Sequence, residues 1–123
     1  MKIIENEITN GGKVIRLSNI SWKDVTEGHV MKAITGKNVM VSFVELAPNK
    51  SLPMHNHPAE QMSYLLQGEA DFTIGEKNYS MKSGDLAIIP SNVIHQVKTC
   101  NTKCVFLDIF SPPRDEFMKD AVK

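Results

Sequence analysis

The sequence predicts an all-β domain, and three observations support this prediction. Short runs of branched and aromatic residues recur at intervals of about 8 to 12 residues. Turn residues separate them, as at Gly36-Lys37-Asn38, Gly68-Glu69 and Ser83-Gly84-Asp85. The 123 residues are enough for one domain, with no linker, internal repeat or low-complexity segment. A β-sandwich or a closed barrel is therefore the expected architecture.

Nine strands and one C-terminal helical segment are expected. The strands are Val14 to Leu17, His29 to Thr35, Val39 to Leu46, Gln61 to Gln67, Ala70 to Ile74, Lys77 to Met81, Leu86 to Ile89, His95 to Lys98 and Cys104 to Phe110. After Pro112 and Pro113, the composition of Arg114 to Val122 predicts a short helical turn, because proline is well tolerated where a helix begins. Trp22 lies outside any periodic pattern and is expected to fill the core.

The charge balance and the amino terminus exclude several classes of partner. Acidic and basic residues number 14 each, and no cluster of Lys or Arg occurs, so nucleic acid is not an expected partner. The opening segment MKIIENEITNGG carries two glutamates where a signal peptide needs an apolar run, and no apolar run approaches the roughly 18 residues of a membrane span. We expect a cytoplasmic protein without a membrane partner.

The segment PMHNHPAEQMSYLLQG carries a candidate metal-binding pattern. Side chains alternate between the two faces of an extended segment, so His55, His57 and Gln61 point to the same side. On a helix the two imidazoles would diverge by about 200°. Pro53 and Pro58 argue against a helix here. Two imidazoles one residue apart can therefore reach one divalent ion.

A third imidazole is available at His95, five residues after Pro90 in GDLAIIPSNVIHQV. With His55 and His57 it suits nickel, zinc, iron, manganese or copper alike, and the sequence does not choose among them. The fourth ligand is either Gln61 or its neighbour Glu60. Gln61 is an even number of positions from both histidines and so shares their face of an extended segment, which favours Gln61.

The strand CVFLDIF is apolar on both faces except for one carboxylate. Both faces must be covered, one by the barrel interior and the other by a second sheet or a partner subunit, and a homodimer is expected. Asp108 shares a face with Phe106 and Phe110. A buried unpaired carboxylate costs several kcal/mol, so Asp108 must be paired, protonated or functional. A structural salt bridge with Arg114 or with a lysine is one alternative.

These motifs resemble those of a known superfamily. HNHPAEQ followed by Gly68, and GDLAIIP followed by His95, are similar to the two sequence motifs of the cupins, between residues 49 and 99. The resemblance implies one cupin domain over residues 1–123, a double-stranded β-helix or jelly-roll barrel that holds a metal ion. Asn49, Gln61 and Thr99 stand where glycine, glutamate and asparagine are frequent. The neutral Gln61 favours Lewis-acid chemistry over a high metal oxidation state.

The segment DIFSPPRDEF, with the early Trp22, resembles the small cupins of the KdgF type. That group promotes conversion of 4,5-unsaturated uronates into linear ketonised sugar acids. The resemblance implies a metal ion held by three histidines and a glutamine, and a small carboxylated sugar as substrate. It also implies catalytic roles for Asp108 and Arg114, and substrate contacts from Phe110 and Arg114. An iron-dependent dioxygenase and a non-catalytic sugar or metabolite binder are the alternatives.

Overall fold

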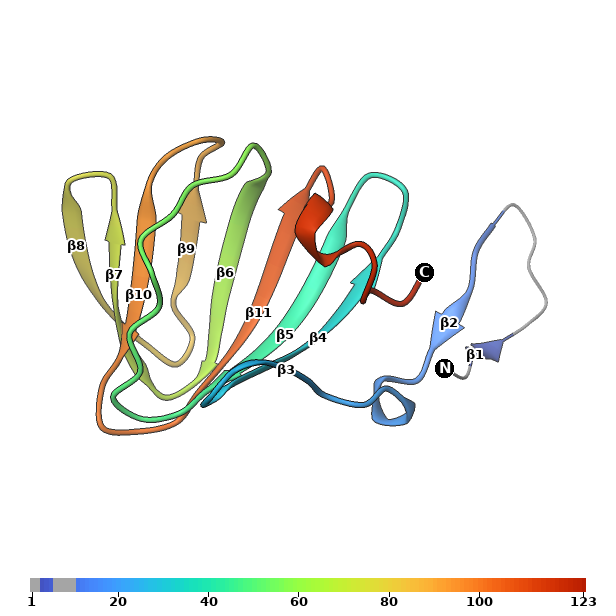
Figure 1. The fold of residues 1–123 in the computed structure, drawn as a ribbon, viewed down its shortest axis with the longest axis horizontal. Coiled ribbons are helices and arrows are strands. Elements are labelled where there is room, and N and C mark those ends of the chain that lie inside the picture. The colour runs from blue at the N-terminus through green and yellow to red at the C-terminus, as the bar shows by residue number, and fades with distance from the viewer. Residues whose placement is uncertain (1–2, 6–10) are drawn as a thin grey trace.

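The computed structural model describes residues 3–5 and 11–123, which form a six-stranded sheet, a three-stranded sheet and a short two-stranded ribbon (Figure 1). All strand pairs named in these sheets are antiparallel. The large sheet has the order β3-β4-β5-β11-β6-β9, and the small sheet the order β10-β7-β8. This is the expected jelly-roll arrangement, with the last strand in the middle of the large sheet.

The elements have the following bounds. They are β1 Ile3–Glu5, β2 Val14–Ile15, the 3-10 helix η1 Leu17–Asn19, β3 Lys23–Thr26, β4 His29–Thr35, β5 Met40–Leu46, β6 Glu60–Gln67, β7 Glu69–Ile74, β8 Lys77–Lys82, β9 Leu86–Ile89, β10 His95–Thr99, β11 Cys104–Ser111 and the 3-10 helix η2 Asp115–Phe117.

The core lies between the two sheets and comes from alternate residues of each strand. In β5 every second side chain is buried, from Met40 to Leu46. Phe72 of the small sheet packs edge-on against Phe106 of the large sheet, with ring centroids 5.8 Å apart. This contact holds the sheets face to face, and the same inward faces carry the polar residues described below.

Gly68 makes the tight turn between β6 and β7. Its φ is +97°, and a Cβ at this position would lie 2.4 Å from the carbonyl oxygen of Lys103. A side chain would therefore displace the start of β11. Gly68 therefore lies in a turn, as expected, and is also required because the backbone of Lys103 passes too close to leave room for a side chain.

The expected strands are confirmed within one or two residues, and β1 and β3 are additions to them. The expected helical segment is much shorter, because only Asp115–Phe117 form a 3-10 turn. Beyond it the chain pairs with the end of β4: Thr35 N donates to Val122 O at 2.8 Å, and Val122 N donates to Ala33 O at 2.8 Å. Strand pairing thus replaces helix at the tail.

The expectation that Trp22 fills the core is wrong. Its side chain is 41% exposed. The Lys32 ammonium lies 4.6 Å from the ring centroid, and Lys32 also donates to the carbonyl oxygen of Leu17. Trp22 therefore helps to attach the segment before β3 to the outer side of β4, through a cation-π contact rather than through burial.

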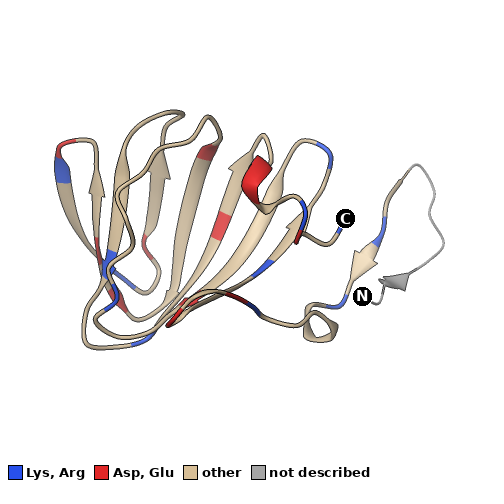
Figure 2. Ribbon diagram, viewed as in Figure 1, with Lys and Arg blue, Asp and Glu red and all other residues tan. Residues whose placement is uncertain are grey.

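No helix among residues 3–5 and 11–123 is long and apolar enough to cross a membrane. Figure 2 shows acidic and basic residues dispersed over loops and strand ends, while the middle of the large sheet is almost uncharged. A dispersed charge pattern of this kind lacks the basic stripe of a nucleic-acid-binding surface.

Candidate metal centre

The fold brings His55, His57 and His95 together, as the sequence predicts. His55 and His57 lie in the segment before β6, and His95 begins β10. The backbones of His55 and His95 pair directly: His55 N donates to His95 O at 3.0 Å, and His95 N donates to His55 O at 2.8 Å. One ligand nitrogen from each of the three imidazoles can be chosen so that all lie within 4.8 Å of one another.

Backbone carbonyls fix the tautomer of all three imidazoles. His55 Nδ1 is 3.0 Å from the oxygen of Pro53, His57 Nδ1 is 2.9 Å from that of Ala59, and His95 Nδ1 is 2.9 Å from that of Val93. A carbonyl oxygen can only accept, so each Nδ1 donates its proton. Each Nε2 is therefore left with a free lone pair, which is the form that binds a metal.

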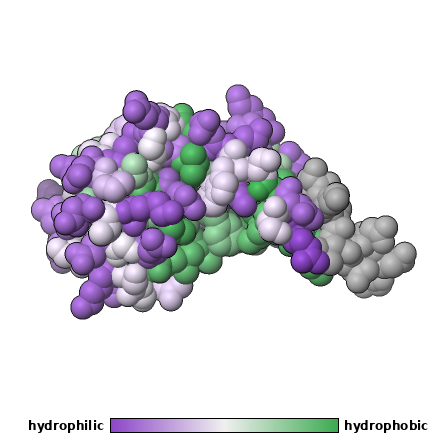
Figure 3. Space-filling model, turned by 90° about the horizontal axis from the view of Figure 1, so that it is seen from below, coloured by the Kyte–Doolittle hydropathy of each residue, from purple (hydrophilic) through white to green (hydrophobic). Residues whose placement is uncertain are grey.

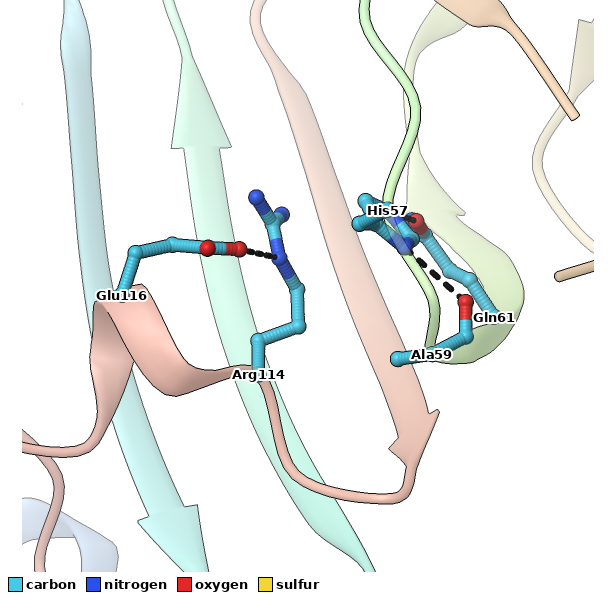
Figure 4. A network of polar contacts seen from close by, with 5 residues as sticks. All are labelled: His57, Ala59, Gln61, Arg114 and Glu116. Atoms are coloured by element: carbon cyan, nitrogen blue, oxygen red, sulfur yellow. Dashed lines mark hydrogen bonds and ion pairs between the residues drawn. The ribbon is translucent and has the colours of Figure 1, made fainter. Parts of the chain in front are cut away.

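Two observations show that these lone pairs suit a cation. His95 Nε2 is buried and has no hydrogen-bond partner among the described residues. His57 Nε2 lies 3.1 Å from Gln61 Oε1, which also carries lone pairs in this tautomer (Figure 4). A bound cation would satisfy all three atoms. Gln61 is buried and faces the cluster, whereas Glu60 is exposed, so the geometry favours Gln61 over its neighbour.

The surroundings keep the imidazoles of His57 and His95 neutral. Burial lowers the pKa of His95 to about 4. Burial and then the positive charge of Arg114 lower the pKa of His57 from its ordinary value. Neutral imidazole is the metal-binding form, so the unprotonated state needed for coordination is already favoured at neutral pH.

The cluster opens into a cavity of about 450 Å³ within the barrel. Such a volume lies within the range of small-molecule sites, ~300–1,000 Å³. Asp108 lines this cavity and accepts a hydrogen bond from Ser63 Oγ at 2.5 Å. Burial raises the pKa of Asp108 to about 6, although hydrogen bonds from Ser63 and Gln61 and the charge of Arg114 act in the opposite direction.

Arg114 and Phe110 also line the cavity. The expected alternative, a salt bridge between Asp108 and Arg114, is not formed. Instead Arg114 Nε donates to Glu116 (Figure 4), and the other ion pair among the described residues joins Lys103 to Glu45. The Arg114 hydrogen bond and charge lower the pKa of Glu116 although burial opposes them. Arg114 is thus held at the cavity wall by a neighbour in its own loop.

Sequence reasoning did not identify three further residues of the site. Ser63 lies two residues after Gln61, so the alternation that selects Gln61 also places Ser63 on the inner face. Glu116 and Phe117 line the cavity as well. No local pattern marks them, because their position depends on the pairing of the tail with β4.

Comparison with known proteins places these features in context. The cupin domain family matches residues 42–110. The pectin degradation protein KdgF of Dickeya dadantii is 27% identical over 99 residues, which cover 79% of this chain and 90% of that protein.

Two solved structures share the fold. KdgF from a Halomonas species has a TM-score of 0.77 at 22% identity, covering 81% of this chain and 93% of its own. An RmlC-like cupin from Shewanella frigidimarina has a TM-score of 0.77 at 21% identity, covering 95% of this chain and 99% of its own. At these identities the structural likeness concerns the fold.

Proposed function

The chain belongs to the cupin domain family, and on that premise we propose that it is a metal-dependent enzyme that converts 4,5-unsaturated uronates into linear keto acids. One observation carries the proposal: the Arg114 guanidinium lines the same cavity as His55 and His95, which form one cluster with His57. The relative named for pectin degradation supports the same substrate class.

Charge in the cavity favours an anionic substrate. Three neutral imidazoles and a neutral amide leave the charge of a divalent ion uncompensated, and Arg114 adds a further positive charge. Glu116 offsets the charge of Arg114 and Asp108 offsets one of the two charges of the ion, so a net positive charge remains. A substrate carboxylate would supply the missing negative charge, and the planar guanidinium matches a carboxylate in a bidentate geometry.

The proposed reaction is an isomerisation that needs no co-reactant. Opening of the sugar ring breaks the bond between C1 and the ring oxygen, leaving an aldehyde at C1 and an enol at C5. Transfer of the enol proton to C4 then gives a ketone at C5. Arg114 holds the carboxylate, Phe110 forms one wall, and Asp108 moves a proton. A divalent ion held by the histidines would polarise a substrate oxygen as a Lewis acid.

The test follows both substrate and product with a monomeric 4,5-unsaturated uronate. The protein, loaded in turn with zinc, nickel, iron, manganese or copper, should remove the absorbance of the C4=C5 bond and yield the keto acid by NMR. A saturated uronate is the control and should not react. Oxygen consumption with iron would assign a dioxygenase instead, and binding without chemical change would assign a binder.

We also propose that two copies associate through the outer face of the large sheet. Two rows of apolar side chains cross four strands in register: Val41, Ile109, Met62 and Ile88 form one, and Phe43, Leu107, Tyr64 and Leu86 form the other. The four on β6 and β9 are each 37% to 54% exposed. Figure 3, a view from below, shows apolar surface along the lower middle of the molecule, with hydrophilic residues around it.

A second copy of this chain is the partner that fits these two rows. Soluble monomers rarely expose contiguous apolar patches beyond a few hundred Å². Sheet faces pack on one another through apolar rows, and a two-fold axis lets one face serve both subunits. The rows carry no charge, and the chain has equal numbers of acidic and basic residues, so two copies do not repel each other.

A further inference from the structure

The carboxamide of Gln61 has two ends of similar shape and opposite hydrogen-bonding character. Its oxygen can coordinate a cation, whereas its NH2 group can only donate. In this structure Oε1 faces His57 Nε2 at 3.1 Å, and the side chain lines the same cavity as Asp108, whose pKa it lowers. The shape of the amide does not select between the two orientations, so its hydrogen-bond partners must.

Asp108 is placed to make that selection. It lies on β11 directly opposite Ser63 of β6, and Phe110 lies opposite Gln61. Gln61 and Ser63 are two residues apart and share the inner face, so the carboxylate of Asp108 lies beside both. Ser63 Oγ donates to Oδ1 of Asp108 at 2.5 Å. The carboxylate is thereby fixed on one side, and an ionised carboxylate can only accept from Gln61 on the other.

We propose that Asp108 is a positioning residue for the fourth metal ligand. Its carboxylate accepts a hydrogen bond from the NH2 group of Gln61, which directs Oε1 toward the lone pairs of the histidines. Ser63 holds the carboxylate in the required orientation. This inference rests on the metal site of the proposed function, but not on the substrate or the reaction.

The arrangement also explains why an amide suits this position. A glutamate at residue 61 would place a second carboxylate against Asp108, and the two would repel or share a proton. Glutamine donates to Asp108 with one end and offers oxygen to a cation with the other. The ligand and the carboxylate behind it are therefore complementary, as partners behind metal ligands commonly are.

The test measures metal affinity, with zinc titrated against a chromophoric chelator. Asp108→Ala should weaken zinc binding ~10- to 100-fold, the usual effect of losing such a partner. Asp108→Asn should bind zinc within a few-fold of the unmodified protein, because its Oδ1 still accepts from Gln61. Ser63→Ala should have an intermediate effect. Asp71→Ala is the matched control, since Asp71 accepts from Ser80 in an exposed pair on the other sheet.

Three outcomes would overturn the proposal. Unchanged zinc affinity in Asp108→Ala would show that Gln61 is oriented without Asp108. Equal weakening in Asp108→Ala and Asp108→Asn would show that negative charge, rather than orientation, is what matters. An effect of Asp71→Ala as large as that of Asp108→Ala would make the loss nonspecific. Asp108→Leu, which keeps the volume, repeats the test if the alanine variant does not fold.

The two proposals fail separately. If the unmodified protein binds zinc but does not convert unsaturated uronates, the substrate assignment is wrong, and the affinity series still tests the role of Asp108. If uronate turns over but the affinity series is flat, only the positioning role is wrong.

Discussion

The guanidinium carbon of Arg114 lies 4.3 Å from the centroid of the Phe117 ring and also contacts the Phe110 ring, at 5.3 Å. Glu116 accepts from Nε of the same guanidinium. Figure 4 shows Arg114 between Glu116 and His57. Two aromatic contacts and one ion pair therefore restrict a side chain that is usually mobile, which prepares it to bind an anion near the histidines.

Replacement of Arg114 by lysine should therefore raise KM for an unsaturated uronate. An ammonium retains the charge but cannot present a planar bidentate fork or stack on the rings in the same way. Loss of one charge-assisted hydrogen bond, about 1.5–3 kcal/mol, corresponds to a fall in kcat/KM of ~10- to 100-fold. Steady-state kinetics would measure it.

Arg16 provides the matched control, because it is the other arginine of the chain and is exposed. Arg16→Lys should leave both kinetic constants unchanged. If Arg114→Lys also leaves them unchanged, the carboxylate of the substrate is held elsewhere.

Asp108→Asn should separate proton transfer from metal binding. Asparagine keeps the shape and an accepting oxygen but cannot take up a proton at neutral pH. Turnover of unsaturated uronate should fall by ~10²- to 10⁴-fold, the usual contribution of a general acid or base. Bound metal, measured by elemental analysis, should stay at the level of the unmodified protein. Full activity in this variant would remove Asp108 from the mechanism, while Asp71→Asn should have no effect.

The sequence was sufficient to predict the strands and the histidine cluster, because both follow from local rules. Alternation places His55, His57 and Gln61 on one side, and the turn after Met81 leads to the strand that precedes His95. These relations depend only on the alternation of side chains between the two faces of short extended segments. The structure preserves that alternation in β6, where Gln61 and Ser63 are both buried.

The part of the cavity wall that Glu116 and Phe117 form could not be predicted in the same way. The composition of residues 114–122 favours helix, but the end of β4 extends beyond its short neighbour β3 and leaves backbone groups to be paired. Val122 pairs with them, which leaves the chain only a single turn at Asp115–Phe117. The contacts of Glu116 and Phe117 follow from that long-range pairing.

The metal-free protein should show an unusual dependence of stability on pH. Burial lowers the pKa of His95 from 6.5 to about 4, so the unfolded chain binds more protons in that interval and stability increases as pH rises through it. Burial raises the pKa of Asp108 from 3.8 to about 6, so there the folded chain binds more protons and stability decreases as pH rises. The two effects oppose each other between about pH 4 and 6.

Asp108→Asn removes the second effect and leaves the first. Its stability should therefore rise more steeply with pH than that of the unmodified protein across this interval. Urea unfolding midpoints, measured with a chelator present at a series of pH values, would compare the two slopes. Parallel slopes would show that Asp108 keeps the same protonation state in the folded and unfolded chains.

Introducing a charge into the outer apolar rows should dissociate the proposed homodimer. Ile88 is 54% exposed and sits at the end of one row on β9, so Ile88→Glu should be tolerated by the fold. In the dimer, however, each copy would bury an unpaired carboxylate at the interface, which costs several kcal/mol. Sedimentation velocity over a range of concentrations should show a dimer for the unmodified protein and a monomer for this variant.

Tyr79→Glu is the matched control for this change. Tyr79 is 46% exposed and lies on β8 of the small sheet, away from the two rows. That variant should remain dimeric. A monomeric unmodified protein at every concentration would mean that the outer face has no second copy as its partner, and loss of the dimer in Tyr79→Glu alone would place the interface on the small sheet. Because β6 and β11 carry the apolar rows outside and Gln61 and Asp108 inside, dissociation should also loosen the strands that support the metal site.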